Sequence, residues 1–157
     1  MRLLASGYDR ITPDGKKFYK EIAELARLKL HVGFQHGETE DNSAADIADI
    51  ADIAMWNELG TSNIPPRPFI RQSVDNNASR ITAMCKRQLQ GITKGTGTAQ
   101  SAYESLGVMQ KGLIQNEILN GGFVPNAPAT IRKKGSDKPL IDTGKMRQSV
   151  TFETVEG

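Results

Sequence analysis

The sequence contains few of the residue types that mark disulfide-bonded, membrane-spanning or metal-binding proteins. Its one cysteine, Cys85, excludes an internal disulfide bond, so we expect synthesis in a reducing cytoplasm. The two histidines, His31 and His36, have no third ligand nearby in the sequence, which predicts surface positions for both and no metal site. Apolar runs are only a few residues long, far below the ~20 that cross a bilayer, and residues 1–7 are too short an apolar stretch for a secretion signal.

An excess of charge of one sign is also lacking. The net charge of +2 is too small to predict a nucleic-acid partner from global electrostatics. Its distribution is uneven, because residues 132–147 are rich in lysine and arginine whereas residues 38–52 are acidic. Opposite local charges can align identical subunits head to tail, and two separately solvated segments are the alternative.

Length and composition fit an ordinary globular protein. With 157 residues, 38% of them hydrophobic and 24% charged, the chain is long enough to bury a core. We therefore expect one domain that covers residues 1–157.

Hydrophobic periodicity predicts a helix followed by a strand in the first third of the chain. Helical spacing indicates a helix over residues 15–28, and alternation of Leu30, Val32 and Phe34 with polar residues or glycine predicts a strand over 29–35. Residues 43–54 contain a repeated Asp-Ile-Ala triplet, read as a helix capped by Ser43. Its aspartates, Asp46, Asp49 and Asp52, form a solvated face rather than a metal site, since the helix rotates them too far apart.

The second half predicts a helical hairpin and a closing strand. After the prolines at 65, 66 and 68, a helix over 70–91 carries an apolar stripe at Val74, Ala78, Ile81, Cys85 and Leu89. A Gly/Thr-rich linker leads to a second helix, with a capping box of Ser101 and Glu104, that ends at Gly121. Gly107 and Gly112 each weaken this helix by ~1 kcal/mol unless close packing against the neighbouring helix exploits them. Residues 149–155 should pair with 29–35.

These elements predict an α+β fold, with a small antiparallel sheet packed against a helical hairpin plus shorter helices. Ile81 and Leu106 are expected on facing stripes of the hairpin.

Two local patterns resemble catalytic or ligand motifs without supporting that chemistry. Leu140-Ile141-Asp142-Thr143-Gly144 matches the way an aspartic protease presents its carboxylate, but only thirteen residues of this sequence follow it. We interpret it as a turn in which Asp142 accepts nearby backbone amides and Gly144 has a positive φ. Cys85 lies on an apolar stripe, which predicts a buried, inert thiol. No enzymatic activity is expected.

The prolines also form a stiff extended segment. Pro65-Pro66-Arg67-Pro68 has the spacing of a polyproline ligand, but the flanking Trp56 and Phe69 favour packing on the chain's own domain. Arg67, held on this segment, is predicted to pair with Glu58 or with a neighbouring subunit.

Two motifs, in their order along the chain, resemble a known protein family. The first runs from Asn57-Glu58-Leu59-Gly60-Thr61 into Ile64-Pro65-Pro66-Arg67-Pro68-Phe69-Ile70-Arg71. The second is Pro139-Leu140-Ile141-Asp142-Thr143-Gly144 followed by Met146-Arg147-Gln148-Ser149-Val150. With the strand ending in Val32-Gly33-Phe34 and the helical pair, residues 15–155 resemble the tail-completion or neck proteins of long-tailed bacteriophages and prophages, the virion morphogenesis family.

The resemblance implies a structural role in virion assembly. It implies a homo-oligomeric ring, expected as a hexamer, at the head–tail junction or the head-proximal end of the tail, in contact with neck, connector and tail proteins. No cofactor, membrane or specific nucleic-acid partner is implied. The candidate interface residues are Glu58, Arg67, Phe69, Arg71, Asp142, Lys145 and Arg147. A competing hypothesis is a nucleic-acid-binding module that uses the basic segment 132–147.

Overall fold

The structure is a computed structural model that describes residues 11–37 and 49–157. Across these residues the chain forms seven helices and a two-stranded antiparallel sheet, which confirms the predicted α+β class. The elements are α1 (Pro13–Arg27), β1 (Leu28–Gly33), α2 (Ile50–Leu59), α3 (Phe69–Asp75), α4 (Ala78–Thr93), α5 (Ala99–Asn120), α6 (Pro128–Lys134), α7 (Lys145–Gln148) and β2 (Thr151–Glu156).

Helix α1 runs directly into strand β1. The helix starts where the hydroxyl of Thr12 accepts the amide of Gly15 at 3.1 Å, with Pro13 in the first turn. Strands β1 and β2 then pair with Leu28 opposite Glu156 and Gly33 opposite Thr151. The predicted pairing of the two strands is confirmed, with shifts of one to two residues at their ends.

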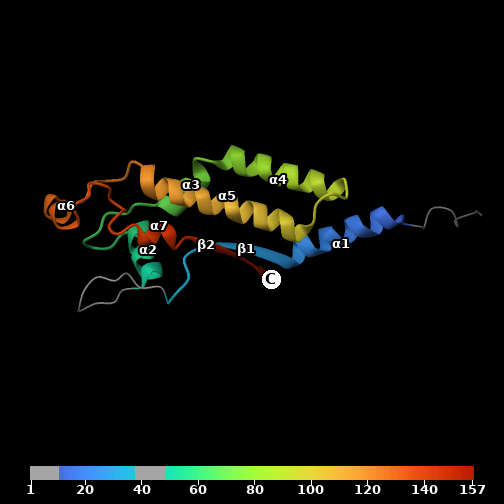
Figure 1. Cartoon of the computed structure of the whole chain (residues 1–157), viewed down its shortest axis with the longest axis horizontal. Coiled ribbons are helices and arrows are strands. Elements are labelled where there is room, and N and C mark those ends of the chain that lie inside the picture. Colours follow the sequence, from blue (N-terminus) through green and yellow to red (C-terminus); the bar gives the residue numbers. More distant parts are fainter. Residues whose placement is uncertain (1–10, 38–48) are drawn as a thin grey trace, which may run out of the picture.

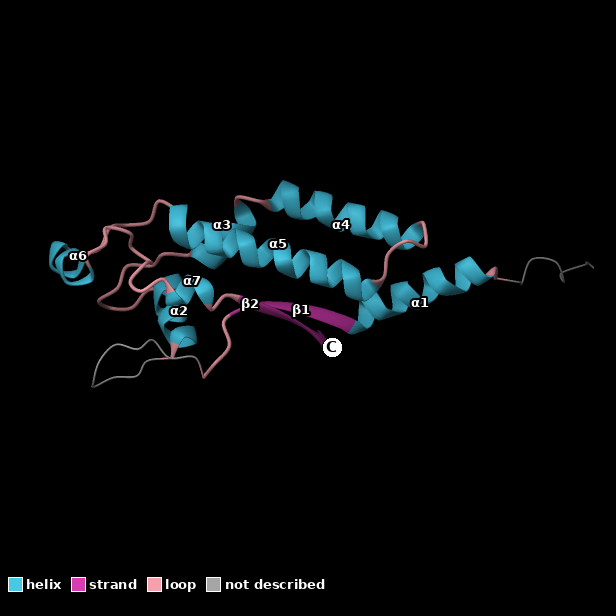
Figure 2. Ribbon diagram, viewed as in Figure 1, coloured by secondary structure: helices cyan, strands magenta, loops and turns pink. Residues whose placement is uncertain are grey.

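Helix α5 is the central element of the molecule. It lies between the sheet and α4, and it packs against both (Figures 1 and 2). The predicted hairpin of α4 and α5 is confirmed. Gly107 is buried on the sheet side, and a Cβ there would overlap the ring of Phe152. The missing side chain at Gly107 thus allows close packing, as predicted, but the element packed against it is strand β2 rather than the neighbouring helix.

The helix predicted over residues 70–91 is two helices. Helix α3 ends at Asp75, and α4 begins at Ala78 after Asn77, whose backbone departs from helical angles at φ −122°, ψ 17°. The side chain of Asn77 donates to the carbonyl oxygen of Ser73 at 3.0 Å, a local bond that competes with continued helix. The expectation of one uninterrupted helix was wrong for this reason.

The break also rotates the apolar stripe of α4. Val74 and Leu89, predicted on the buried side, are exposed, and Cys85 is half-buried rather than buried. Ile92, beyond the predicted end of the stripe, is the fully buried residue of this helix. The apolar stripe was predicted for one continuous helix. The residues assigned to its buried face at both ends were therefore wrong.

Helix α5 starts earlier than predicted. Thr98 caps it, because its hydroxyl accepts the amide of Ser101 while the hydroxyl of Ser101 accepts the amide of Thr98, both at 3.1 Å. Ser101 is therefore the third residue of the capping box and not its first. The predicted stop is confirmed, with Gly121 at the C-cap and Gly122 at φ 62°.

Asp49 caps the start of helix α2. The carboxylate of Asp49 accepts the amide of Ala51 at 2.9 Å and that of Gly37 at 2.7 Å, so this aspartate does not belong to a solvated face as predicted. The predicted Ser43 cap and Asp46 lie outside the described residues. His31 and His36 are exposed, as predicted.

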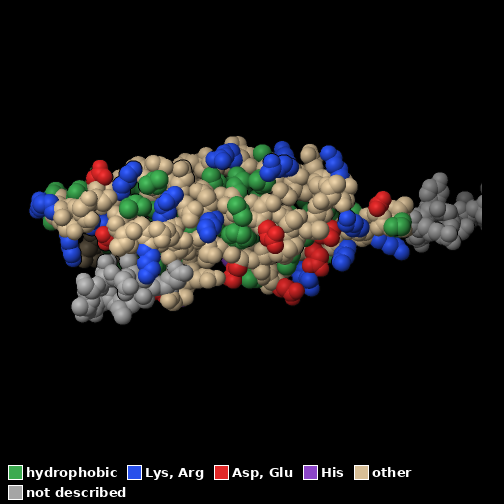
Figure 3. Space-filling view, in the orientation of Figure 1, with side chains coloured by type: hydrophobic (Ala, Val, Ile, Leu, Met, Phe, Trp, Pro, Cys, Tyr) green, Lys and Arg blue, Asp and Glu red, His purple; other side chains and the backbone are tan. Residues whose placement is uncertain are grey.

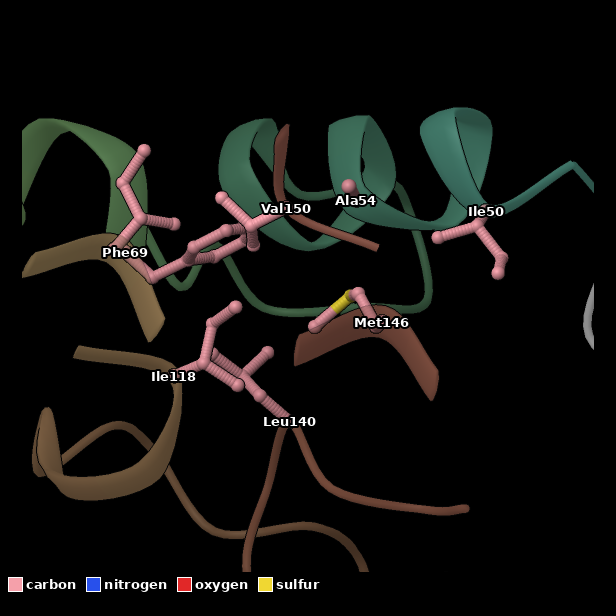
Figure 4. Packing of buried hydrophobic residues seen from close by; sticks show 8 residues of the cluster. Ile50, Ala54, Phe69, Ile118, Leu140, Met146 and Val150 are labelled. Atoms are coloured by element: carbon pink, nitrogen blue, oxygen red, sulfur yellow. The ribbon is translucent and has the colours of Figure 1, made fainter. Parts of the chain in front are cut away.

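The main hydrophobic core lies where α2, α3 and α5 meet the segment that leads into β2. Figure 4 shows Phe69, Ile118 and Val150 close to one another, with Leu140 below them and Met146, Ala54 and Ile50 toward the right. Both sequence motifs contribute to this cluster, the first through Phe69 and the second through Leu140, Met146 and Val150.

Candidate functional site

The two motifs that were far apart in the sequence line one hollow. Its volume is about 350 Å³. One wall is the proline strap, which we define as residues 64–68, and another is the Asp142 turn, residues 139–144. The loop before α6 and, from α6 itself, Thr130 and Lys134 close the remaining side. Its lining residues include Ile53, Asn57, Ile64, Arg67, Asn126, Thr130, Lys134, Leu140, Asp142 and Met146.

Arg67 fastens the proline strap to the loop before α6. Its side chain is 4% exposed. The Nε atom donates to the carbonyl oxygen of Val124 at 3.0 Å, Nη1 donates to Oδ1 of Asn57 at 3.2 Å, and Nη2 donates to Oδ1 of Asn126 at 2.9 Å. The planar fork of arginine is suited to such divergent acceptors. The strap is thus fixed by a buried network.

A backbone hydrogen bond also joins Arg67 to Asn57. The amide of Arg67 donates to the carbonyl oxygen of Asn57 at 2.6 Å, so Asn57 holds Arg67 through both main chain and side chain. Burial lowers the pKa of Arg67 below its usual value, yet a guanidinium stays charged at neutral pH. The buried guanidinium of Arg67 depends on all three neutral oxygens, because each accepts a hydrogen bond that replaces one the charge would have made to water.

Glu58 has a different role from the one predicted. Its carboxylate oxygens accept the amides of Ile70 at 2.8 Å and Arg71 at 3.0 Å, at the start of α3. This end of α3 has no side-chain cap of its own, and a carboxylate is favourable beside exposed helix amides. The predicted pairing of Arg67 with Glu58 was wrong, since amide acceptors hold Arg67 and helix amides hold Glu58.

Gly60 and Thr61 turn the chain between α2 and the strap. Gly60 has φ 77°, and a Cβ there would lie 3.0 Å from the carbonyl oxygen of Ile64 and from the ring of Pro66. The hydroxyl of Thr61 accepts the amides of Asn63 and Ile64. Gly60 and Thr61 therefore have local structural roles within the first motif.

The Asp142 turn was predicted in part. Gly144 has φ 81°, as expected. The side chain that accepts a backbone amide is Thr143, whose hydroxyl receives the amide of Lys145 at 3.2 Å, rather than Asp142. Asp142 is exposed and lies on the wall of the hollow. The turn directs Met146 into the core and β2 into the sheet.

The structure separates the candidate interface residues into two groups. Arg67 and Phe69 are buried within the chain, and the ring of Phe69 packs against Phe34 with centroids 6.1 Å apart, so their contacts are internal. Neither side chain is therefore exposed for a contact with another subunit. Arg71, Asp142 and Arg147 are exposed, while Glu58 and Lys145 are half-buried.

Sequence reasoning missed the partners of Arg67. Asn126 and the carbonyl group of Val124 lie in a segment that the sequence marks only as a proline-containing loop. The side chain of Asn126 also donates to the carbonyl oxygen of Pro139 at 3.3 Å, so one amide joins the strap to the Asp142 turn. An asparagine between two prolines was the available signal, and it indicated a turn rather than a partner for arginine.

The charges around the hollow are mainly positive. Helix α6 carries Arg132, Lys133 and Lys134 in its last turn. Lysine and arginine side chains are visible at this end of the molecule in Figure 3, where Figure 1 places α6. Arg147 is tied to α5, since its Nε donates to the carbonyl oxygen of Gln115 at 3.3 Å.

Among the described residues, no group of three or more histidine, cysteine, aspartate or glutamate side chains is arranged to hold a metal ion. No helix in the same part of the chain is both long and apolar enough to cross a membrane.

Comparison with known proteins returned no match. No protein-family model, no curated protein and no solved structure is detectably similar to this chain.

Proposed function

We propose that this chain is a structural subunit of a bacteriophage or prophage virion. It acts at the head–tail junction or the head-proximal end of the tail, as one member of a homo-oligomeric ring that contacts neck, connector and tail proteins. The proposal includes the absence of enzymatic activity. Its basis is the resemblance in motif order described above, together with one observation on the fold.

That observation is the convergence of the two motifs on one hollow. The proline strap and the Asp142 turn are rigidly joined through Arg67 and Asn126, yet Asp142 itself is exposed. Arg71, in the first turn of α3 just after the strap, is exposed as well. A surface whose backbone is fixed before association loses little conformational entropy when it binds. Repeated contacts between identical subunits, or with the next ring of a virion, favour such a surface.

The first test is deletion of the gene in the phage or prophage that encodes it. We expect heads and tails that fail to join, or tails of faulty length, in electron micrographs of the lysate, and restoration by the wild-type chain in trans. Normal numbers of completed particles after deletion would contradict the proposal.

The second test uses surface variants. Arg71→Ala and Asp142→Ala each remove a side chain with no hydrogen bond to the described part of the chain, so the melting temperature should stay nearly unchanged while completed particles decrease. Lys86→Ala on the exposed side of α4 is the matched control and should complement fully. Equal complementation by all three variants would show that Arg71 and Asp142 are not part of the contact surface.

The protease alternative is tested with the same protein. Unfolded substrates incubated at acid and neutral pH should remain intact. Cleavage that disappears in Asp142→Asn would show that the Asp-Thr-Gly sequence is catalytic.

The nucleic-acid alternative is favoured by one feature, the exposure of Arg132 and Lys133 on the last turn of α6. Cations at the end of a molecule can contact phosphates without reading sequence.

A further inference from the structure

Within the described residues, the sheet has only two strands, and each strand has one edge with no strand beside it. The order is β1–β2, and both strands are six residues long. Two strands alone make a marginal sheet, and a free edge offers unpaired amides and carbonyls to another chain. Helix α5 packs on one face of this sheet but does not pair with either edge.

The ladder shows which backbone groups point outward. The amide of Gly157 donates to the carbonyl oxygen of Arg27 at 2.7 Å, so this pair is hydrogen-bonded. Alternation along an antiparallel ladder then directs the backbone groups of Lys29, His31, Val155 and Glu153 inward. The outward groups belong to Leu30 and Val32 on β1 and to Phe152, Thr154 and Glu156 on β2.

The outer face of the sheet is charged asymmetrically. Phe152 packs on Gly107 of α5, so Lys29, His31 and Glu153 lie on the opposite, solvent-facing side. Strand β1 presents the basic side chains and β2 presents the acid. Within one chain, Nδ1 of His31 already lies 3.8 Å from a carboxylate oxygen of Glu153.

This asymmetry selects one way of joining two copies. Pairing β1 with β1 would bring lysine and histidine together, and pairing β2 with β2 would bring glutamates together. Pairing β1 of one copy with β2 of the next places Glu153 opposite His31 in one register. A shift of two residues places it opposite Lys29. Because the two edges are different surfaces, this contact is heterologous and continues into a ring or a filament.

The widths are compatible with such a continued sheet. Two strands occupy about 10 Å, at roughly 4.8 Å per strand, and packed helices lie about 8–10 Å apart. Each copy contributes two strands and one covering helix, α5, so neighbouring α5 helices have room side by side. Helix α4 lies on the far side of α5 from the sheet (Figures 1 and 2).

We propose that a second copy of this chain completes the sheet, with the outer edge of β1 pairing antiparallel to the outer edge of β2 in the neighbouring copy. The inference rests on the proposed function for its expectation of a ring, and it adds which surfaces form the contact.

Amide hydrogen exchange at increasing protein concentration tests the pairing directly. The outward amides of Leu30, Val32, Phe152 and Thr154 should exchange quickly in dilute protein and become at least tenfold slower when copies associate. The inward amides of His31 and Glu153 serve as the internal control, because they are protected in the monomer. Association without slower exchange at the outward amides would overturn the proposal.

A charge exchange provides the second test. Lys29→Glu and Glu153→Lys should each weaken self-association at least tenfold by sedimentation, and the double variant K29E/E153K should recover most of it. Circular dichroism and melting temperature establish that each variant is folded. Weakening that the double variant does not reverse would contradict the register that places Glu153 opposite Lys29.

The two proposals can fail separately. If the gene is required for particle assembly but the outward amides never become protected, the sheet-edge contact is wrong and the virion role stands. If copies pair through their sheet edges but deletion leaves particles intact, the virion role is wrong and the contact stands.

Discussion

Removal of the Arg67 side chain should destabilise the fold. In Arg67→Ala, two asparagine oxygens and the carbonyl oxygen of Val124 lose their donor in a buried position. Unsatisfied buried groups cost about 1–3 kcal/mol each, in part relieved by water, so we expect a loss of about 2–4 kcal/mol in the free energy of unfolding. Urea denaturation measures it.

Arg67→Lys is the informative companion variant. A lysine ammonium keeps the charge but cannot reach three divergent acceptors as a planar fork does. It should therefore also destabilise, by more than half of the alanine effect. A lysine variant as stable as the wild type would show that charge, rather than geometry, holds the strap.

Asp49 should make stability depend on pH. Its pKa is lowered in the folded chain, first by the amide of Gly37, next by that of Ala51, with a smaller contribution from His36. A lowered pKa means that the ionised form stabilises the fold above the unfolded value of about 3.9 and that this stabilisation is lost as pH falls through the folded value.

Asp49→Asn tests this expectation, because asparagine still caps a helix but does not titrate. Between about pH 6 and pH 3, the unfolding midpoint of the wild type should fall more steeply than that of the variant. Parallel curves would show that other carboxylates account for the acid sensitivity.

Single residues were the hardest level to predict. Gly144 was assigned its positive φ correctly, because the turn around it was recognised. The contacts of Glu58 and Arg67 were not predictable, because they depend on where α3 and a distant loop lie. Sequence spacing gives the face of an element but not its neighbours.

At the scale of the element, the two glycines of α5 should respond oppositely to alanine. Gly107→Ala forces a Cβ against the ring of Phe152, and overpacking of this kind costs about 1–3 kcal/mol. Gly112 has no atom within 4 Å of a built Cβ, so Gly112→Ala should stabilise the helix by up to about 1 kcal/mol. Thermal unfolding of both variants measures the difference, and equal effects would show that α5 does not press on β2.

A second pair of variants tests the corrected stripe of α4. Ile92 is buried, so Ile92→Ala should cost about 2–5 kcal/mol, whereas Leu89 is 47% exposed and Leu89→Ala should stay within about 0.5 kcal/mol. Denaturation midpoints distinguish the two. A larger loss for Leu89→Ala than for Ile92→Ala would instead favour the stripe predicted for a single helix over 70–91.

Elements were predicted well where periodicity is strong and poorly where side chains compete with the backbone. Helix α1 and strand β1 follow from residue spacing, and β2 follows from its content of β-forming residues, with small boundary shifts. The break at Asn77 and the cap at Thr98 depend on side-chain bonds to particular amides and carbonyls. Several residues near each boundary could make such bonds, so the sequence did not select among them.

For the whole molecule, the class and the pairing of its strands could be predicted, but the hollow could not. Two apolar-alternating segments and a helical hairpin have few ways to bury their faces other than a sheet against a helix. The hollow requires Asn57, Asn126 and Pro139 to meet, and no local pattern specifies contacts over such separations. The two motifs indicated important positions without indicating that they share a wall.

The last prediction concerns the basic end of the molecule. If α6 is a solvated surface, any retention of DNA on a filter should be independent of sequence and should vanish between about 50 mM and about 200 mM salt, as expected for phosphate contacts alone. The double variant R132S/K133S should lose retention at low salt yet complement particle assembly like the wild type. Sequence-selective retention that persists at about 150 mM salt, and that this variant abolishes, would instead favour a nucleic-acid-binding module, because specific sites are bound far more tightly than random DNA at that salt.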